Sequence, residues 1–252
     1  MKVIVGGLAV EYMDEGNGPV MLFLHGWGQD ATSFNSPISV LANKFRIIRP
    51  DLPGFGGSEL PKVAWGVHQY ADFLQQFLNK LNTQPEVVIG HSLGGQIAVK
   101  ALADGLIKPK KLILIGAAVI RESHQSPRNK AFAASAKVGK AITSLPGLRR
   151  IQPLLRRQLY TVTGNNDYNL AGAMKPTFLK ITKQDLQNEA SLIVTPTLII
   201  WGDKDTETPI EQGRRLAYLI KGSTLEVFSG GHFIFDDQSE RVAAAIERFA
   251  DA

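Results

Sequence analysis

One serine lies in a sequence context that suits a nucleophile. Ser92 belongs to GHSLGG (90–95), which follows the apolar run EVVI and opens the run LGGQIAVKALA. This order predicts a strand, a tight turn that carries the serine, and a helix. Glycines two residues before and two residues after Ser92 leave room for a strained turn, and the N-terminal N–H groups of the helix would face a reacting carbonyl. The pattern therefore predicts a serine hydroxyl that is held out of the sheet for attack.

A serine hydroxyl is a weak nucleophile at neutral pH, so it needs a base. The chain has five histidines, at positions 25, 68, 91, 124 and 232. The first ends a predicted strand, the third adjoins the serine, and the second and fourth lie in segments typical of the surface. His232 lies in the glycine-rich loop SGGHF (229–233) after the last predicted strand, from which it can reach over the strand ends. We therefore expect His232 to be the general base.

The histidine needs a carboxylate that fixes its tautomer and stabilises the imidazolium formed during reaction. The sequence WGDKD (201–205), directly after the seventh predicted strand, supplies Asp203 and Asp205. Asp205 lies farther into the loop, whereas Asp203 is better placed to brace the turn. We expect Asp205 to orient His232, and the chain order Ser, Asp, His is the one known for serines on a strand–turn–helix elbow.

Two backbone N–H groups are candidates for holding the negative charge that develops on a carbonyl oxygen. Leu93 follows the nucleophile at the start of the predicted helix. Trp27 lies in HGWG (25–28), a loop after the third predicted strand that combines flexibility with a large side chain. We expect Trp27 and Leu93 to be the oxyanion donors, and we expect His25 to hold the loop in place by hydrogen bonding.

The remaining motifs indicate no cofactor and no metal. The glycine-rich DLPGFGGS (51–58) lacks the Gly-Lys-Ser/Thr of a phosphate-binding loop, which favours a rigid turn. The chain also has no GxGxxG after its first strand, no HExxH and no carboxylate cluster suited to a metal. Because the sequence contains no cysteine, thiol nucleophiles, disulfides and thiolate metal sites are excluded.

The elements that must position these residues alternate between strand and helix. Short, β-branched apolar runs predict eight strands, at residues 2–5, 8–13, 20–24, 45–49, 86–89, 111–115, 197–201 and 224–228. Helical patterns lie at residues 34–42, 67–81, 93–103, 209–220 and 239–249. Thr208 is expected to cap the helix that begins at Pro209. The alternation predicts an α/β fold with a mostly parallel sheet, which begins with an antiparallel hairpin at Gly6-Gly7.

Residues 119–192 interrupt this alternation. Breaks at positions 146–147, 164 and 176 divide the stretch, which predicts short helices that begin near 126–127 and span 148–161 and 167–181. We therefore expect a helical insertion into one core formed by residues 1–118 and 193–252.

The positive charge of the chain is concentrated in that insertion. It holds twelve Lys and Arg against four Asp and Glu, a local charge of +8 in a chain whose net charge is +5. Arg149, Arg150, Arg156 and Arg157 form two pairs seven residues apart, so a helix would present them as one basic patch beside the entrance to the site. The patch either only aids solubility or steers an anionic substrate or an acidic carrier protein. No nucleic-acid motif accompanies it, so nucleic acid is not an expected partner.

Composition places the chain among ordinary globular proteins. Hydrophobic residues make up 44% and charged residues 20% of the sequence. The N-terminal residues carry one lysine and no apolar run long enough for a signal peptide, and no later stretch approaches a membrane span. We expect a cytoplasmic location.

Taken together, these motifs resemble the α/β-hydrolase superfamily over nearly the whole chain. The resemblance rests on HGWG (25–28), DLPGFGGS (51–58), GHSLGG (90–95), PTLIIWGDKD (196–205) and GGHF (230–233), which occur in the order of the family. It implies an eight-stranded, mostly parallel sheet flanked by helices, and it identifies residues 119–192 as a helical lid. It also implies a triad of Ser92, Asp205 and His232, with Trp27 and Leu93 as oxyanion donors.

The resemblance implies carbonyl chemistry, because haloalkane dehalogenases and epoxide hydrolases of this fold use an Asp where this chain has Ser92. The HGWG loop and the basic lid are similar to those of carboxylesterases such as the pimeloyl-carrier-protein methyl ester esterases. Hydrolysis of a small carboxylic ester through an acyl-enzyme is therefore the expected reaction. Alternatives are carbon–carbon hydrolysis of a diketone, whose enzymes typically carry an HGSGPG-like loop that this chain lacks, and cleavage of an amide, lactone or thioester. A ligand receptor without turnover, built on the same triad, is a further alternative.

Overall fold

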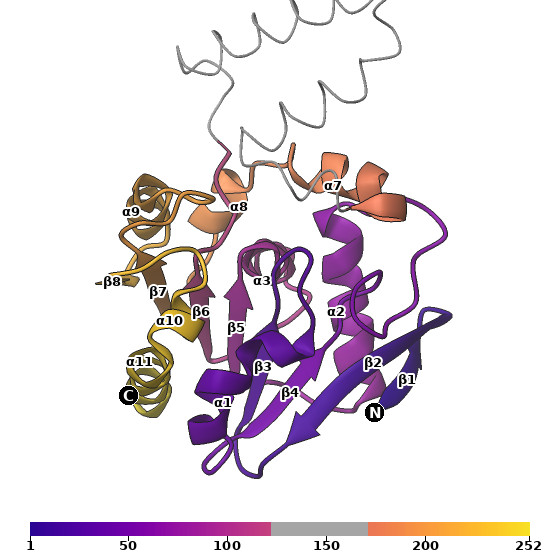
Figure 1. The fold of residues 1–252 in the computed structure, drawn as a ribbon, viewed down its shortest axis with the longest axis horizontal. Coiled ribbons are helices and arrows are strands. Elements are labelled where there is room, and N and C mark those ends of the chain that lie inside the picture. The colour runs from indigo at the N-terminus through magenta and orange to yellow at the C-terminus, as the bar shows by residue number, and fades with distance from the viewer. Residues whose placement is uncertain (122–170) are drawn as a thin grey trace, which may run out of the picture.

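Eight strands form one sheet through the middle of the protein, seen in a computed structural model that describes residues 1–121 and 171–252 (Figure 1). The strands are β1 (Lys2–Val5), β2 (Leu8–Glu15), β3 (Val20–Leu24), β4 (Arg46–Pro50), β5 (Val87–His91), β6 (Lys111–Ile115), β7 (Thr197–Gly202) and β8 (Thr224–Phe228). Their order across the sheet is β1-β2-β4-β3-β5-β6-β7-β8. Each lies within two residues of the bounds that the sequence predicts.

The sheet is antiparallel only at its N-terminal side. β1 and β2 form a hairpin around Gly6-Gly7 in which Val5 lies opposite Leu8, and β2 also runs antiparallel to β4. All other neighbouring pairs, from β4–β3 to β7–β8, are parallel. The expected eight-stranded, mostly parallel sheet and its hairpin are therefore confirmed.

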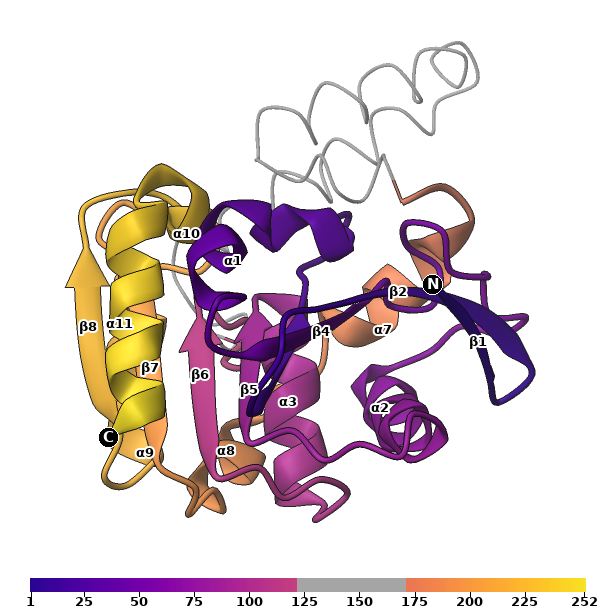
Figure 2. The same cartoon turned by 90° about the horizontal axis from the view of Figure 1, so that it is seen from below.

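Helices cover both faces of the sheet. In the described ranges they are η1 (Ala31–Phe34), α1 (Asn35–Leu41), α2 (Val67–Lys80), α3 (Leu93–Ala103), η2 (Gly172–Met174), α7 (Lys175–Ile181), α8 (Gln187–Ser191), α9 (Ile210–Leu219), α10 (Ile234–Asp237) and α11 (Ser239–Asp251). Buried residues of α1, α10 and α11 form the core on one face, and those of α2, α3, α8 and α9 form the core on the other (Figure 2). Among these helices none is both long and apolar enough to cross a membrane.

The strands supply both cores through the alternation of their side chains. In β3, Leu22 and Leu24 belong to the core under α2 and α3, whereas Met21 and Phe23 belong to the core under α1 and α11. Each such side chain stabilises the fold by about 1.5–3 kcal/mol when it is fully buried. Because strands buried on both faces are apolar throughout, they appear in the sequence as short continuous apolar runs.

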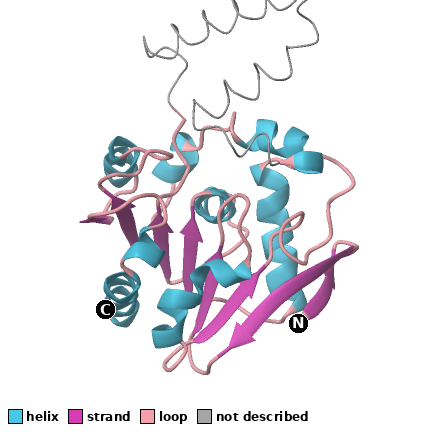
Figure 3. Ribbon diagram, viewed as in Figure 1, coloured by secondary structure: helices cyan, strands magenta, loops and turns pink. Residues whose placement is uncertain are grey.

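The parallel strands end at one edge of the sheet, as the arrows in Figure 3 show. The loops that follow β3, β5, β6, β7 and β8 therefore meet there. In open α/β sheets this edge is where ligands bind. All the residues singled out by the sequence for chemistry lie in these loops or at the first residues that follow them.

The segment between β6 and β7 is described in part. The helices expected near 126–127 and over 148–161 lie outside the described residues, as do Arg149, Arg150, Arg156 and Arg157. Of the helix expected over 167–181, the described part forms η2 and α7. The described part of the segment is attached to the core by hydrogen bonds from the Trp65 N–H to Thr177 Oγ1 (3.1 Å) and from the Val67 N–H to Gln184 Oε1 (2.8 Å).

Candidate active site

Ser92 occupies a strained turn between β5 and α3. Its backbone has φ 48° and ψ −110°, a conformation that side chains with a Cβ rarely adopt and that costs of order 1–3 kcal/mol. The turn is fixed by hydrogen bonds from the Ser92 N–H to the Ile115 carbonyl and from the Ala118 N–H to the Ser92 carbonyl, both of 3.1 Å. The strand, turn and helix expected around the serine are present, with the strain that the glycine spacing predicts.

Gly94 allows the start of α3 to pack directly on the end of β3. A Cβ on Gly94 would lie 2.0 Å from the Leu24 carbonyl oxygen, so no other residue fits. This contact brings the first residue of α3, Leu93, next to the loop that follows β3. The Leu93 N–H is at a helix N-terminus and has no intrahelical acceptor, so it is available to a ligand.

The loop after β3, residues 25–29, carries the expected oxyanion donor Trp27 and is named the oxyanion loop after that expectation. His25 is buried and its Nε2 accepts a hydrogen bond of 2.9 Å from the Leu52 N–H. The ring proton therefore lies on Nδ1, which donates to the Gly26 carbonyl at 2.8 Å. Burial lowers the pKa of His25, in keeping with this neutral tautomer. Because the Gly26 carbonyl and the Trp27 N–H share one planar peptide, His25 fixes the direction of the Trp27 N–H.

The side chain of Trp27 is packed between two aromatic rings. Its ring lies 4.9 Å from that of Phe55 and 5.0 Å from that of Phe178 in α7, both nearly edge-on. Phe55 belongs to the turn 51–58, in which Asp51 accepts hydrogen bonds of 2.7 Å from the N–H groups of Ala31 and Gly57. Hydrogen bonds to Asp51 thus fix the turn that the sequence predicts to be rigid, and Phe55 of this turn packs against the oxyanion loop from one side.

Asp205 and His232 form a buried pair. Asp205 Oδ2 lies 2.7 Å from His232 Nδ1, and both side chains are at most 5% exposed. Asp205 Oδ1 accepts the N–H groups of Glu207 (2.9 Å) and Thr208 (2.8 Å). Burial opposes the ionisation of Asp205, but the bonds from His232 and Thr208 outweigh it and lower the pKa of the carboxyl group. The carboxylate thus stays ionised, which holds the proton of His232 on Nδ1 and leaves Nε2 to accept one.

Asp203 makes different contacts from those of Asp205. Its Oδ1 accepts a hydrogen bond of 3.0 Å from the Gly230 N–H, and its own N–H donates to the Phe228 carbonyl. These bonds connect the loop after β7 to the loop after β8 that carries His232. Asp203 therefore braces the turn, as expected, and it is Asp205 that contacts His232.

Thr208 does not cap the following helix, so this expectation is wrong. The N-cap of α9 is Pro209, without a side-chain hydrogen bond, and the helix begins at Ile210. The Thr208 hydroxyl lies instead 2.8 Å from Asp205 Oδ2 and 3.2 Å from His232 Nδ1. A buried carboxylate needs its lone pairs satisfied more than an exposed helix end does, because water serves the helix end.

Ser92 and the Asp205–His232 pair converge on the end of β6. Ile115 accepts the Ser92 N–H, and a Cβ on the next residue, Gly116, would lie 3.2 Å from His232 Nδ1 and 3.3 Å from Asp205 Oδ2. On the other side of His232, Glu207 Oε2 lies 3.6 Å from Nε2. The structure therefore brings together residues from the loops after β5, β6, β7 and β8. Position alone could have indicated Gly116, since it directly follows the predicted strand 111–115.

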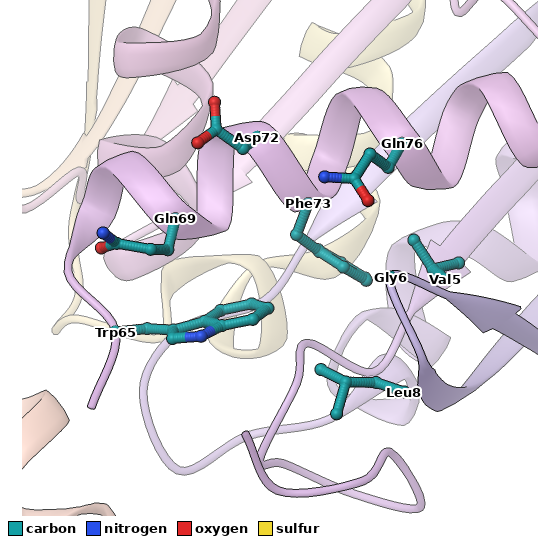
Figure 4. Close-up of a pocket in the computed structure, with 8 residues that line it drawn as sticks. All are labelled: Val5, Gly6, Leu8, Trp65, Gln69, Asp72, Phe73 and Gln76. Atoms are coloured by element: carbon teal, nitrogen blue, oxygen red, sulfur yellow. The ribbon is translucent and has the colours of Figure 1, made fainter. Parts of the chain in front are cut away.

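A separate cavity of about 240 Å³ lies at the hairpin edge of the sheet, between the β1–β2 turn and α2 (Figure 4). Trp65 and Phe73 face the hairpin residues Val5 and Leu8 there, and none of the candidate active-site residues lines it. Within residues 1–121 and 171–252, no three or more His, Cys, Asp or Glu side chains are grouped so as to hold a metal.

Comparisons with known proteins agree with this fold. The alpha/beta hydrolase family matches residues 21–245 of the chain. An uncharacterised protein of Mycobacterium tuberculosis is 29% identical over 264 residues, which cover 94% of this chain and 76% of the relative. An esterase from Exiguobacterium antarcticum has a similar structure, with a TM-score of 0.78 and 25% identity, covering 100% of this chain and 99% of the esterase. An enol-lactonase from Burkholderia xenovorans has a TM-score of 0.76 at 22% identity, with both chains fully covered. The chain belongs to the alpha/beta hydrolase family.

Proposed function

We propose that the protein is a serine hydrolase that cleaves a carboxylic ester through an acyl-enzyme. The observation that carries the proposal is the buried 2.7 Å contact between Asp205 and His232, beside a serine held in a strained elbow. In this proposal Ser92, His232 and Asp205 are the nucleophile, base and orienting acid of a triad. Any ester that reaches Ser92 also meets the N–H groups of Trp27 and Leu93.

The reaction follows from the placement of these groups. His232 Nε2 takes the proton of the Ser92 hydroxyl as Oγ forms a bond to the ester carbonyl carbon, and the carbonyl oxygen becomes an oxyanion. The N–H groups of Trp27 and Leu93 hold that oxyanion. When the carbon–oxygen bond to the alcohol breaks, His232 returns the proton to the departing oxygen and leaves an acyl group on Ser92. Water, deprotonated by His232, then releases the acid and restores the serine.

The comparisons support hydrolysis more broadly than they support esters. The Exiguobacterium protein is described as an esterase and the Burkholderia protein as an enol-lactonase, and both reactions attack an ester-type carbonyl. A meta-cleavage product hydrolase shares the fold with a TM-score of 0.74 at 19% identity. The substrate panel therefore has to extend beyond simple esters.

Two measurements test the proposal. A fluorophosphonate should label the wild-type protein and fail to label Ser92→Ala, and p-nitrophenyl acetate should give a burst of product followed by steady turnover. A single burst without turnover would favour a ligand receptor. If Ser92→Ala retained more than about one thousandth of the wild-type rate, beyond what the oxyanion donors supply alone, the nucleophile would be another residue.

The substrate class is tested by a panel of esters with acyl chains of increasing length, together with a ring-fission diketone, a lactone and a thioester. Ester hydrolysis predicts that one of the oxygen esters has the highest kcat/KM. A higher kcat/KM for the diketone would instead identify a carbon–carbon bond hydrolase.

A further inference from the structure

The side chain of His91 is buried beside the candidate nucleophile, yet the proposed reaction does not use it. His91 is the last residue of β5 and only 1% of it is exposed. Because side chains alternate along a strand, it shares a face of the sheet with Ile89. Its ring packs edge-on against Phe235, with ring centroids 4.8 Å apart. A polar ring in such an apolar layer costs about 1–3 kcal/mol unless its nitrogens are hydrogen-bonded.

Both nitrogens of His91 have polar neighbours, and these belong to two different loops. Nδ1 lies 2.9 Å from Gln29 Oε1, and Nε2 lies 3.1 Å from the carbonyl oxygen of His232. Gln29 Oε1 also accepts the Gly26 N–H at 2.9 Å. The ring of His91 therefore stands between the oxyanion loop and the loop that carries His232.

A neutral His91 ring has too few protons to donate to both of its neighbours. The His232 carbonyl and Gln29 Oε1 are both acceptors, but a neutral imidazole has one N–H to donate. Burial lowers the pKa of His91 well below its ordinary value, so the ring is neutral. A neutral ring bonds both neighbours only if the Gln29 carboxamide turns its NH₂ group toward Nδ1. The Gly26 N–H then loses its acceptor, so the state of His91 is tied to the backbone of the oxyanion loop.

The oxyanion loop has no free space at Gly26 into which its backbone could move. A Cβ on Gly26 would lie 2.6 Å from Gln29 Oε1 and 2.8 Å from His91 Nδ1. On its other side, the same residue is held through its carbonyl by His25. A shift of the His91 ring is therefore passed to the Gly26 backbone, one residue before the N–H of Trp27.

We propose that His91 is a positioning residue that fixes the oxyanion loop and the His232 loop relative to each other. It contacts Gln29 through one ring nitrogen and the His232 carbonyl through the other. The inference rests on the proposed serine-hydrolase function. It assigns His91 no contact with substrate, so its loss should reduce the rate of the chemical step at an otherwise intact Ser92.

The first test replaces His91 by Phe, which keeps the ring packing against Phe235 and removes both nitrogens. Sites are counted by fluorophosphonate labelling, and kcat with p-nitrophenyl acetate is expressed per labelled site. We expect kcat to fall about 10- to 100-fold with KM changed less than about threefold, because a small misplacement of the catalytic groups has effects of this size. His91→Gln, which keeps a donor and an acceptor, should recover part of the loss. The matched control is His68→Phe on the exposed face of α2, which should leave kcat unchanged.

The second test changes Gln29, the partner of His91 Nδ1. Gln29→Leu should lower kcat in the same way, and the double variant should be no more than about threefold slower than the slower single variant, because both changes break one connection. If the double variant showed the product of the two single effects, or if both single variants had wild-type kcat per labelled site, the proposal would be wrong. Should His91→Phe fail to fold, Gln29→Leu decides alone. These outcomes are separate from the serine-hydrolase proposal, which is tested by the fluorophosphonate labelling and turnover of the wild type and by the inactivity of Ser92→Ala.

Discussion

The hydroxyl of Thr208 lies 2.8 Å from the same carboxylate oxygen of Asp205 that contacts His232. It also lies 3.2 Å from the Gly116 carbonyl, so this hydroxyl connects the loops after β6 and β7. A threonine that looks from its sequence like a helix cap thus completes the hydrogen bonding of the buried carboxylate. The Asp205–His232 geometry consequently depends on a residue outside the three proposed catalytic ones.

Replacement of Thr208 by Val should therefore impair catalysis without enlarging the site. The variant removes a hydrogen bond to a charged group, which contributes about 1.5–3 kcal/mol, so kcat/KM should fall about 10- to 100-fold. Steady-state kinetics with p-nitrophenyl acetate provide the measurement. Thr206→Val, an exposed neighbour two residues earlier, is the matched control and should be close to wild type. Equal rates for the two variants would remove Thr208 from this role.

The two aspartates after β7 should respond very differently to amide substitution. Asp205→Asn leaves His232 with a neutral partner that favours the wrong tautomer, so kcat should fall by a factor of order 10⁴. Asp203→Asn retains an oxygen that can accept the Gly230 N–H, so its kcat should fall less than about tenfold. A larger loss in Asp203→Asn than in Asp205→Asn would transfer the orienting role.

The depressed pKa of Asp205 links stability to pH. A carboxyl group with a lower pKa in the folded than in the unfolded state stabilises the fold above the unfolded value, and this contribution is lost as the pH falls through the folded value. The difference in unfolding free energy between wild type and Asp205→Asn should thus shrink as the pH falls below the ordinary aspartate range. Urea unfolding across this range provides the measurement, and a difference that grew toward low pH would contradict the assignment.

The backbone strain at Ser92 predicts a gain in stability when the side chain is removed. Ser92→Gly should raise the unfolding free energy by about 1 kcal/mol, because glycine adopts a positive φ freely but loses more chain entropy on folding. For a chain of this size the gain corresponds to a rise in Tm of roughly 2–4 °C. Ser92→Ala lacks the hydroxyl but keeps the Cβ, so it should show no such rise. A similar rise in both variants would mean that the hydroxyl, not the backbone, is the source of the strain.

The charge of the insertion gives a prediction from sequence alone. If the four arginines at 149, 150, 156 and 157 steer an anionic substrate or an acidic carrier protein, replacing all four by Ser should lower kcat/KM for an anionic ester and weaken its salt dependence. Hydrolysis of a small neutral ester should change little. Equal losses for charged and neutral esters would show that the arginines serve the packing of the segment.

The sequence predicts the sheet well because each strand carries its own signal. A run such as residues 111–115 is apolar on both faces, and its bounds agree with β6 to the residue. The prediction fails where distant contacts decide. The helix expected over 34–42 is present as α1, but the sequence does not predict the 3₁₀ helix η1 before it, where Asp30 is the N-cap and the first N–H, that of Ala31, donates to the distant Asp51.

In the candidate site, too, local patterns are predicted correctly and distant contacts are not. A glycine two residues on either side of Ser92 is a local pattern, and it correctly predicts the turn. The partners of His91 are separated from it by 62 and 141 residues, and no local pattern specifies such contacts. Thr208 misleads for a related reason, since the usual preference of threonine for helix caps is overridden by a carboxylate that becomes its neighbour only in the fold.

The two ends of the segment between β6 and β7 are fastened to each other. The Leu186 N–H donates to the Val119 carbonyl at 3.0 Å, and the Arg121 N–H donates to Asp185 Oδ1 at 3.2 Å. Because the entropy of closing a loop grows only slowly with its length, this clasp permits residues 122–184 to be exchanged for a segment of another length and sequence. Such exchange would replace Phe178, which packs on Trp27, while Ser92, Asp205 and His232 stay in the core. On the proposed function, the clasp makes the segment a module through which evolution or protein engineering can change the substrate range while Ser92, Asp205 and His232 keep their places.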